Sequence, residues 1–132
     1  MSSDNLAKDE EEFHTAYRVF LDALGMLAMP AQQQCVAMGN FNVAWELKHD
    51  VAAGKYLVGR GYLNPEQEAW IAALAGAVEA VPVQVLPAGA ESEANLTAMQ
   101  HASWVPLRVI AAEVLEALSP FTTQNAKYLK LA

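Results

Sequence analysis

Apolar side chains recur at every third or fourth position along most of the chain, which is the spacing of an amphipathic α-helix. The first such row runs through Phe13, Tyr17, Phe20, Leu24 and Leu27. Side chains at these positions share one face of a helix and pack against neighbouring elements. We therefore predict a first helix from Asp9 to Ala28.

The next periodic stretch begins at Pro30, because proline suits the first turn of a helix and excludes continuation of the preceding one. Its apolar positions form two rows, Cys35, Met38, Phe41, Trp45, Ala52 and Tyr56 in one and Val36, Val43, Leu47 and Val51 in the other. Two rows make a broad apolar face, which predicts a central helix that packs against several others. Gly39 lies inside this stretch, and we interpret it as a place where another helix crosses closely. The glycines at 54, 59 and 61 predict the end of this helix.

A complete helix-start signal follows at Asn64. Asn64 is a good N-cap, Pro65 suits the first helical position, and Gln67 stands where the second residue of a capping box belongs. The third predicted helix then carries an apolar row of Trp70, Ile71, Leu74, Val78 and Val81.

The second half of the chain contains several prolines that divide it. Pro82 and Pro87 bracket a valine-rich segment, which we interpret as an extended crossover rather than a strand of a sheet. A fourth helix is predicted from Ser92 to Leu118, with a kink at Pro106 or a split near Trp104. Ser119 and Pro120 predict the start of a last short helix that holds Phe121, Tyr128 and Leu131.

These elements predict an all-α fold, a single-domain bundle of four to five helices with an extended, proline-bracketed crossover. Residues 1–8 are expected to be a flexible acidic tail, and residues 9–132 the helical domain. The length of 132 residues is sufficient for one core, and an apolar fraction of 54% with 17% charged residues excludes a disordered chain. The net charge of -7 opposes contact with nucleic acid or an anionic membrane.

The expected location is the cytoplasm, since the first residues show neither the basic nor the apolar part of a secretion signal. No stretch approaches 18 uninterrupted apolar residues, so a membrane-spanning helix is not expected. Cys35 is the single cysteine, which excludes an internal disulfide and favours a small buried side chain.

A positively biased window interrupts the acidic chain. Lys48, Lys55 and Arg60 lie close together in sequence, whereas residues 61–107 contain acids and no lysine or arginine. The glycines near them resemble a phosphate-binding loop only in spacing, because the required Lys-Ser or Lys-Thr pair and the preceding strand are missing. We take Lys48, Lys55 and Arg60, with the aromatic side chain of Trp45, as the candidate ligand-binding residues for a small anion.

A metal site is the alternative that the histidines suggest. A glutamate stands three positions before both His14 and His49, a spacing that places the two side chains on one helical face in di-metal carboxylate bundles. Such a site also needs glutamates from other helices, for which Glu79 and Glu113 are available. The ligands of a transition metal in this alternative would be Glu46, His49, His14 and Glu113; otherwise no cofactor is expected.

No catalytic residue can be assigned, because the chain lacks a Gly-x-Ser-x-Gly motif and its serines lie at termini and helix ends. The leading hypothesis is therefore a non-enzymatic protein-protein interaction module whose acidic surface meets a basic partner. An inhibitor, an adaptor or a toxin-immunity protein would fit this description. The alternatives are a helical bundle that binds a metal or a small ligand, and a homo-oligomer built through the valines of residues 81–86.

Overall fold

The computed structural model of the chain describes residues 3–82 and 89–125, with side chains from residue 8 onward. Over these residues the fold is all-α and contains no strand, as predicted. Two of the predicted helices are divided, so the described chain has more α-helices than the predicted four to five. The elements are α1 (Ser3–Leu27), α2 (Ala31–Ala37), α3 (Val43–Ala52), the 3-10 helix η1 (Ala53–Leu57), α4 (Pro65–Glu79), α5 (Ser92–Met99) and α6 (Trp104–Gln124).

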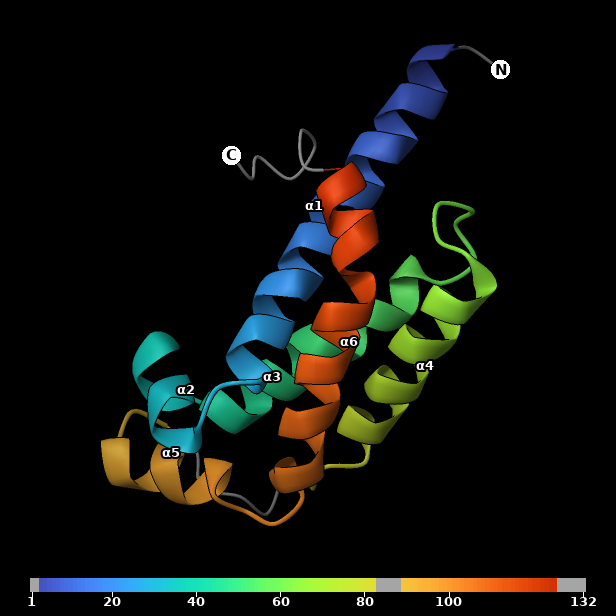
Figure 1. The fold of residues 1–132 in the computed structure, drawn as a ribbon. Coiled ribbons are helices and arrows are strands. Elements are labelled where there is room, and N and C mark those ends of the chain that lie inside the picture. Colours follow the sequence, from blue (N-terminus) through green and yellow to red (C-terminus); the bar gives the residue numbers. More distant parts are fainter. Residues whose placement is uncertain (1–2, 83–88, 126–132) are drawn as a thin grey trace.

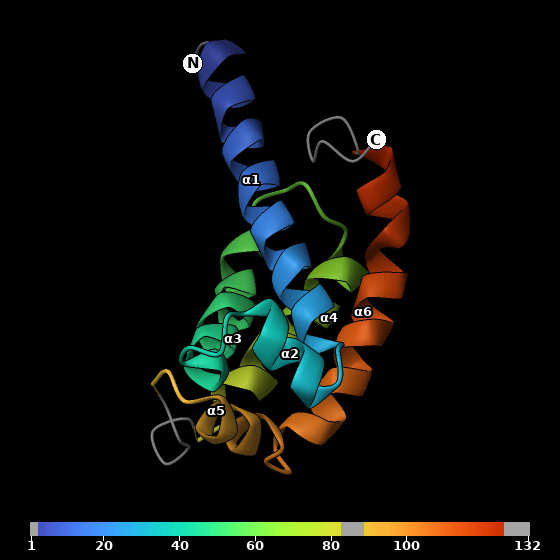
Figure 2. The ribbon, with the colours of Figure 1, turned by 90° about the vertical axis from the view of Figure 1, so that its left-hand side faces the viewer.

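The long helices α1 and α6 run side by side (Figure 1). Helix α4 packs against α6 and α3, and α3 packs against α1. The short helices α2 and α5 pack together at one end of the bundle, whereas the N-terminal part of α1 projects beyond the other end (Figures 1 and 2). None of the helices in the described ranges is long and apolar enough to cross a membrane.

One apolar core joins these helices. Its largest fully buried side chains are Trp104, Tyr17, Phe13, Leu24, Leu27, Leu47, Leu57, Ile71, Leu74, Met99 and Leu118. The row predicted for the first helix is confirmed, because all five of its side chains are buried. Helix α1 begins at Ser3 rather than at the predicted Asp9, so residues 3–8 continue the helix instead of forming a separate tail. This stretch contains no proline or glycine that would end the helix, and its one acid, Asp4, favours a helix N-terminus.

The prediction of one continuous second helix is wrong. Helix α2 ends at Ala37, and Gly39, Asn40 and Asn42 have φ angles of 72°, 53° and 44°. A left-handed backbone cannot continue a right-handed helix, and asparagine and glycine are the residues that adopt it most easily. Gly39 therefore belongs to a turn and does not mark a helix crossing.

A buried asparagine fixes this turn between α2 and α3. The side-chain oxygen of Asn95 accepts a hydrogen bond from Val43 N at 2.9 Å, and its Nδ2 donates to the carbonyls of Asn40 and Gly89. The Asn42 side chain accepts a further hydrogen bond from Gly89 N at 2.7 Å. Since Asn95 is fully buried, these contacts hold the turn against the segment that leads into α5.

Helix α4 forms as its start signal predicts. Asn64 Oδ1 accepts a hydrogen bond from Gln67 N at 2.8 Å, and Gln67 Oε1 accepts one from Asn64 N at 2.9 Å. Pro65 occupies the first position of the helix. Both halves of the capping box are therefore present, which explains why this boundary could be read from the sequence.

The predicted fourth helix is split before Trp104 into α5 and α6, one of the two outcomes expected from Pro106. The separate last helix at Ser119 and Pro120 is wrong, because α6 continues through Pro120 to Gln124. Phe121 is buried on α6, and its packing favours continuation of the helix past the proline. The predicted crossover, with its valine interface, falls largely on residues 83–88, which lie outside the described residues, as do Tyr128 and Leu131.

Candidate functional site

Two exposed aromatic side chains, those of Trp45 and Tyr56, line a common hollow on the surface of the molecule. Phe41, Trp45 and Tyr56 are 54%, 53% and 67% exposed, and they are the exposed aromatic residues among the described side chains. Phe41 directly precedes α3, Trp45 lies in its first turn, and Tyr56 lies in η1. We call Trp45, His49 and Tyr56 together the aromatic face. Their exposure corrects the expectation that the row containing Phe41, Trp45 and Tyr56 packs against other helices, whereas Val43, Leu47 and Val51 of the other row are buried.

A hollow of about 360 Å³ lies within the aromatic face and is lined by Trp45, Lys48, His49, Ala52, Ala53, Lys55 and Tyr56. The α3 residues among these share one side of the helix, because positions three and four apart are neighbours on a helical surface. The helix then tightens into η1 at Ala53, and this change brings Lys55 and Tyr56 to the same hollow. The two alanines leave room between the larger side chains.

The aromatic rings in the hollow have defined geometry. The rings of Trp45 and His49 are stacked, with centroids 5.5 Å apart and planes 8° from parallel. Lys55 Nζ lies 5.3 Å from the centroid of the Tyr56 ring, which is within the range of a cation-π contact. The hollow therefore offers flat aromatic surfaces beside ammonium groups.

The two lysines of the hollow differ in how their charge is balanced. Lys55 Nζ forms an ion pair with Glu79 Oε1 at 2.9 Å, and this hydrogen bond and charge raise the pKa of Lys55. Lys48 Nζ donates to the backbone carbonyl of Val81 at 2.7 Å. No described carboxylate forms an ion pair with Lys48. Asp50 lies 3.4 Å from His49 Nδ1 beside the hollow.

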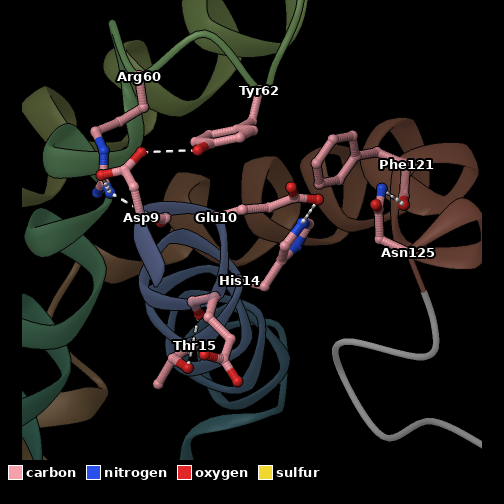
Figure 3. A network of polar contacts seen from close by, with 9 residues as sticks. Asp9, Glu10, His14, Thr15, Arg60, Tyr62, Phe121 and Asn125 are labelled. Atoms are coloured by element: carbon pink, nitrogen blue, oxygen red, sulfur yellow. Dashed lines mark hydrogen bonds and ion pairs between the residues drawn. The ribbon is translucent and has the colours of Figure 1, made fainter. Parts of the chain in front are cut away.

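Arg60 is not part of this hollow. Its Nη2 lies 3.0 Å from Asp9 Oδ1, and Tyr62 OH donates to Asp9 Oδ2 at 2.7 Å (Figure 3). These hydrogen bonds, from Tyr62 first and then from Arg60, lower the pKa of Asp9. The contacts tie the segment between η1 and α4 to α1, so Arg60 has a structural partner. Of the candidate ligand-binding residues, the structure brings Trp45, Lys48 and Lys55 together and places Arg60 elsewhere.

The candidate metal ligands are distributed over three helices. His14 is buried on α1, with Nε2 3.8 Å from Glu10 Oε1 and its ring stacked against Phe121 (Figure 3). Burial lowers the pKa of His14. Glu46 and His49 lie on α3, and Glu113 is exposed on α6. Among the described residues, no three His, Cys, Asp or Glu side chains are grouped closely enough to hold a metal ion.

Four lining residues were not predicted as ligand-binding residues, and two of them, His49 and Tyr56, carry rings. His49 was considered as a metal ligand, and Tyr56 was placed in a buried row. Gly39, Asn40 and Asn42 carried a sequence signal for the break between α2 and α3, because these residue types favour turns and left-handed backbone. A turn there allows the residues after it to face solvent instead of continuing the helical row.

Comparison of the chain with protein-family models, curated proteins and solved structures finds no match.

Proposed function

We propose that the protein is a non-enzymatic interaction module that binds a protein partner through the aromatic face. The observation that carries this proposal is the pair of exposed aromatic side chains, Trp45 and Tyr56, that line one hollow. Exposing large aromatic side chains forgoes the free energy of burying them, about 2 kcal/mol for a fully buried ring. Aromatic residues are enriched in the central anchors of protein interfaces, where a partner supplies the missing burial.

The aromatic face is also held in place before any partner binds. Asn95 and Asn42 fix the backbone on both sides of Phe41, and the ring of Trp45 rests on that of His49. Left-handed asparagines such as Asn40 and Asn42 are held only where surrounding contacts favour them. Preorganised side chains lose less conformational entropy on association, which favours a binding role for this region.

A cytosolic protein partner fits the other properties of the chain. The net charge of -7 disfavours nucleic acid, and the buried thiol of Cys35 is compatible with a reducing compartment. We propose an inhibitor, an adaptor or a toxin-immunity protein as the type of module. In each of these roles, binding alone performs the function and no catalytic group is required.

The proposal is tested by capture of partners in the cell that makes the protein. The tagged full chain is compared with the double variant Trp45→Ala and Tyr56→Ala, and bound proteins are identified by mass spectrometry with native mass for stoichiometry. We expect a stoichiometric partner of the wild-type chain that the double variant loses. The matched control is Val105→Ala with Val109→Ala, which also removes exposed apolar side chains, but from α6.

Two results would contradict the proposal. One is an identical set of bound proteins for the wild type and the double variant. The other is a monomeric wild-type chain that retains no partner after mild chemical crosslinking in the cell.

A further inference from the structure

Lys48 is fixed at the hollow by its own backbone contact. Its Nζ donates to Val81 O at 2.7 Å, which positions the ammonium group at the end of its flexible stem. An ammonium group has three hydrogen-bond donors, and this contact uses one of them. No described carboxylate pairs with this charge. A charged group in this position can donate to an anionic ligand without first breaking an ion pair.

The charges around Lys48 limit the kind of anion that fits. The charge of Lys55 is balanced by Glu79, and Asp50 adds a further negative charge beside His49. A phosphate group or a polyanion, with two or more negative charges, would therefore meet one unpaired ammonium group and the nearby carboxylate of Asp50. A single carboxylate matches the one unpaired positive charge of the hollow.

The remaining surface of the hollow favours an apolar neighbour for that carboxylate. Trp45, His49 and Tyr56 supply flat rings, and Ala52 and Ala53 leave the space between them open. The volume of about 360 Å³ is at the lower end for small-ligand pockets, which suits one or two side chains rather than a large molecule.

We infer that the hollow on α3 and η1 recognises an acidic segment of the protein partner, in which a carboxylate side chain lies next to an aromatic one. The carboxylate would accept a hydrogen bond from Lys48 Nζ, and the aromatic side chain would stack against Trp45 and Tyr56. This inference rests on the proposed function, because it specifies the chemistry of the partner at the aromatic face. The net charge of the chain alone suggests a basic partner. The unpaired ammonium group of Lys48 favours an acidic segment instead, because the local charge of the hollow decides the contact.

The test uses two acetylated and amidated dipeptides, Asp-Phe and its isosteric neutral analogue Asn-Phe. Binding to the full chain is followed by the indole N–H resonance of Trp45, assigned with Trp45→Phe, because the other two tryptophans are buried or half-buried. We expect dissociation constants of about 1 mM for such small probes. The Asp-Phe dipeptide should bind about threefold more tightly, as expected for one solvent-exposed charge pair.

The variant Lys48→Met keeps the length of the stem but removes the charge, and it should abolish the preference for Asp-Phe over Asn-Phe. Lys48→Arg keeps the charge and should retain the preference. Lys8→Met is the matched control, because it removes an exposed positive charge on α1. The ratio of the two dissociation constants is measured within each variant, so a general change in the shape of the hollow affects both probes.

Equal affinity of the wild type for the two dipeptides would overturn the inference, and so would an Asp-Phe preference that persists in Lys48→Met. Failure of the dipeptide test together with capture of a partner through Trp45 and Tyr56 would remove only the carboxylate specificity. A Lys48-dependent preference without any captured partner would instead remove the proposed function and leave a carboxylate-binding hollow.

Discussion

Two groups of aromatic side chains in this molecule contain similar residues in opposite environments. The first, which we call the core cluster, consists of Phe13, His14, Tyr17, Tyr62 and Phe121, and the second is the aromatic face of Trp45, His49 and Tyr56. Each group contains a histidine stacked on an aromatic ring. The side chain of His14 is 3% exposed, whereas that of His49 is 67% exposed.

The difference arises from what covers each group. The core cluster lies between α1 and α6, and the pair of Arg60 and Asp9 holds the segment after η1 over it (Figure 3). The guanidinium carbon of Arg60 lies 5.8 Å from the centroid of the Phe13 ring. No element of the described chain covers the aromatic face in this way. Aromatic residues therefore stabilise the bundle in one region and remain available for binding in the other.

The largest contrast between the groups is expected for removal of a ring. Phe13→Ala should lower the free energy of unfolding by about 3–5 kcal/mol, because it leaves a cavity in a fully buried position. Trp45→Ala should change it by no more than about 0.5 kcal/mol, as is usual for exposed positions. Urea denaturation followed by circular dichroism measures both. Similar losses for the two variants would show that the aromatic face belongs to the stabilising core.

The next effect concerns the asparagine that holds the turn beside the aromatic face. Asn95→Ala should lower the free energy of unfolding by about 2–3 kcal/mol, because it leaves several buried backbone groups without their hydrogen bonds. Asn125→Ala is the control, since within the described residues the Asn125 side chain makes one hydrogen bond, at the end of α6. Hydrogen exchange of the Val43 amide should also become faster in Asn95→Ala. Unchanged exchange there would argue against a fixed turn.

The same comparison shows which parts of the fold can be read from sequence. The row from Phe13 to Leu27 and the capping box at Asn64 depend on residues within a few positions of one another, and both were predicted. The break after Ala37 depends on Asn95, which lies 52 positions from Val43 along the chain. Because the apolar spacing continues across the break, periodicity alone favoured one long helix.

The candidate site likewise has one part that local spacing predicts and one part that depends on distant positions of the chain. Trp45 and Lys48 lie on one helical side, and Lys55 follows soon after, so their proximity could be predicted from local spacing. Arg60 pairs with Asp9, which is 51 positions away, and no local pattern reveals that contact. The exposure of Tyr56 likewise depends on how η1 packs rather than on its place in an apolar row.

A smaller effect is expected at Gly54, where the region of the hollow meets the core. A Cβ atom on this glycine would overlap the ring of buried Phe20. Gly54→Ala should therefore destabilise the protein by about 1–3 kcal/mol through overpacking. Gly76→Ala is the matched control, because a Cβ there meets nothing within 4 Å, and it should stabilise α4 by about 0.5–1 kcal/mol. A neutral or stabilising Gly54→Ala in thermal denaturation would contradict the close packing of η1 on α1.

The smallest effect is the change of folding stability with pH that buried His14 is expected to cause. Burial holds the pKa of His14 below its usual value of 6.5, and the neighbouring Glu10 carboxylate opposes this shift only in part. Between the lowered pKa and 6.5, the unfolded chain binds a proton that the folded chain does not, so stability falls as the pH drops below about 6.5. Asp9 adds a separate loss only at more acidic pH, because its lowered pKa lies below 3.8.

Urea midpoints measured between pH 7.5 and pH 5 should therefore decrease more steeply for the wild type than for His14→Gln. His49→Gln is the matched substitution at the exposed histidine of the aromatic face, and its slope is measured beside that of His14→Gln. The slope of stability against pH is compared rather than stability itself, since a change at buried His14 also alters packing. A wild-type slope that persists in His14→Gln would contradict a contribution of buried His14 to the pH dependence of stability.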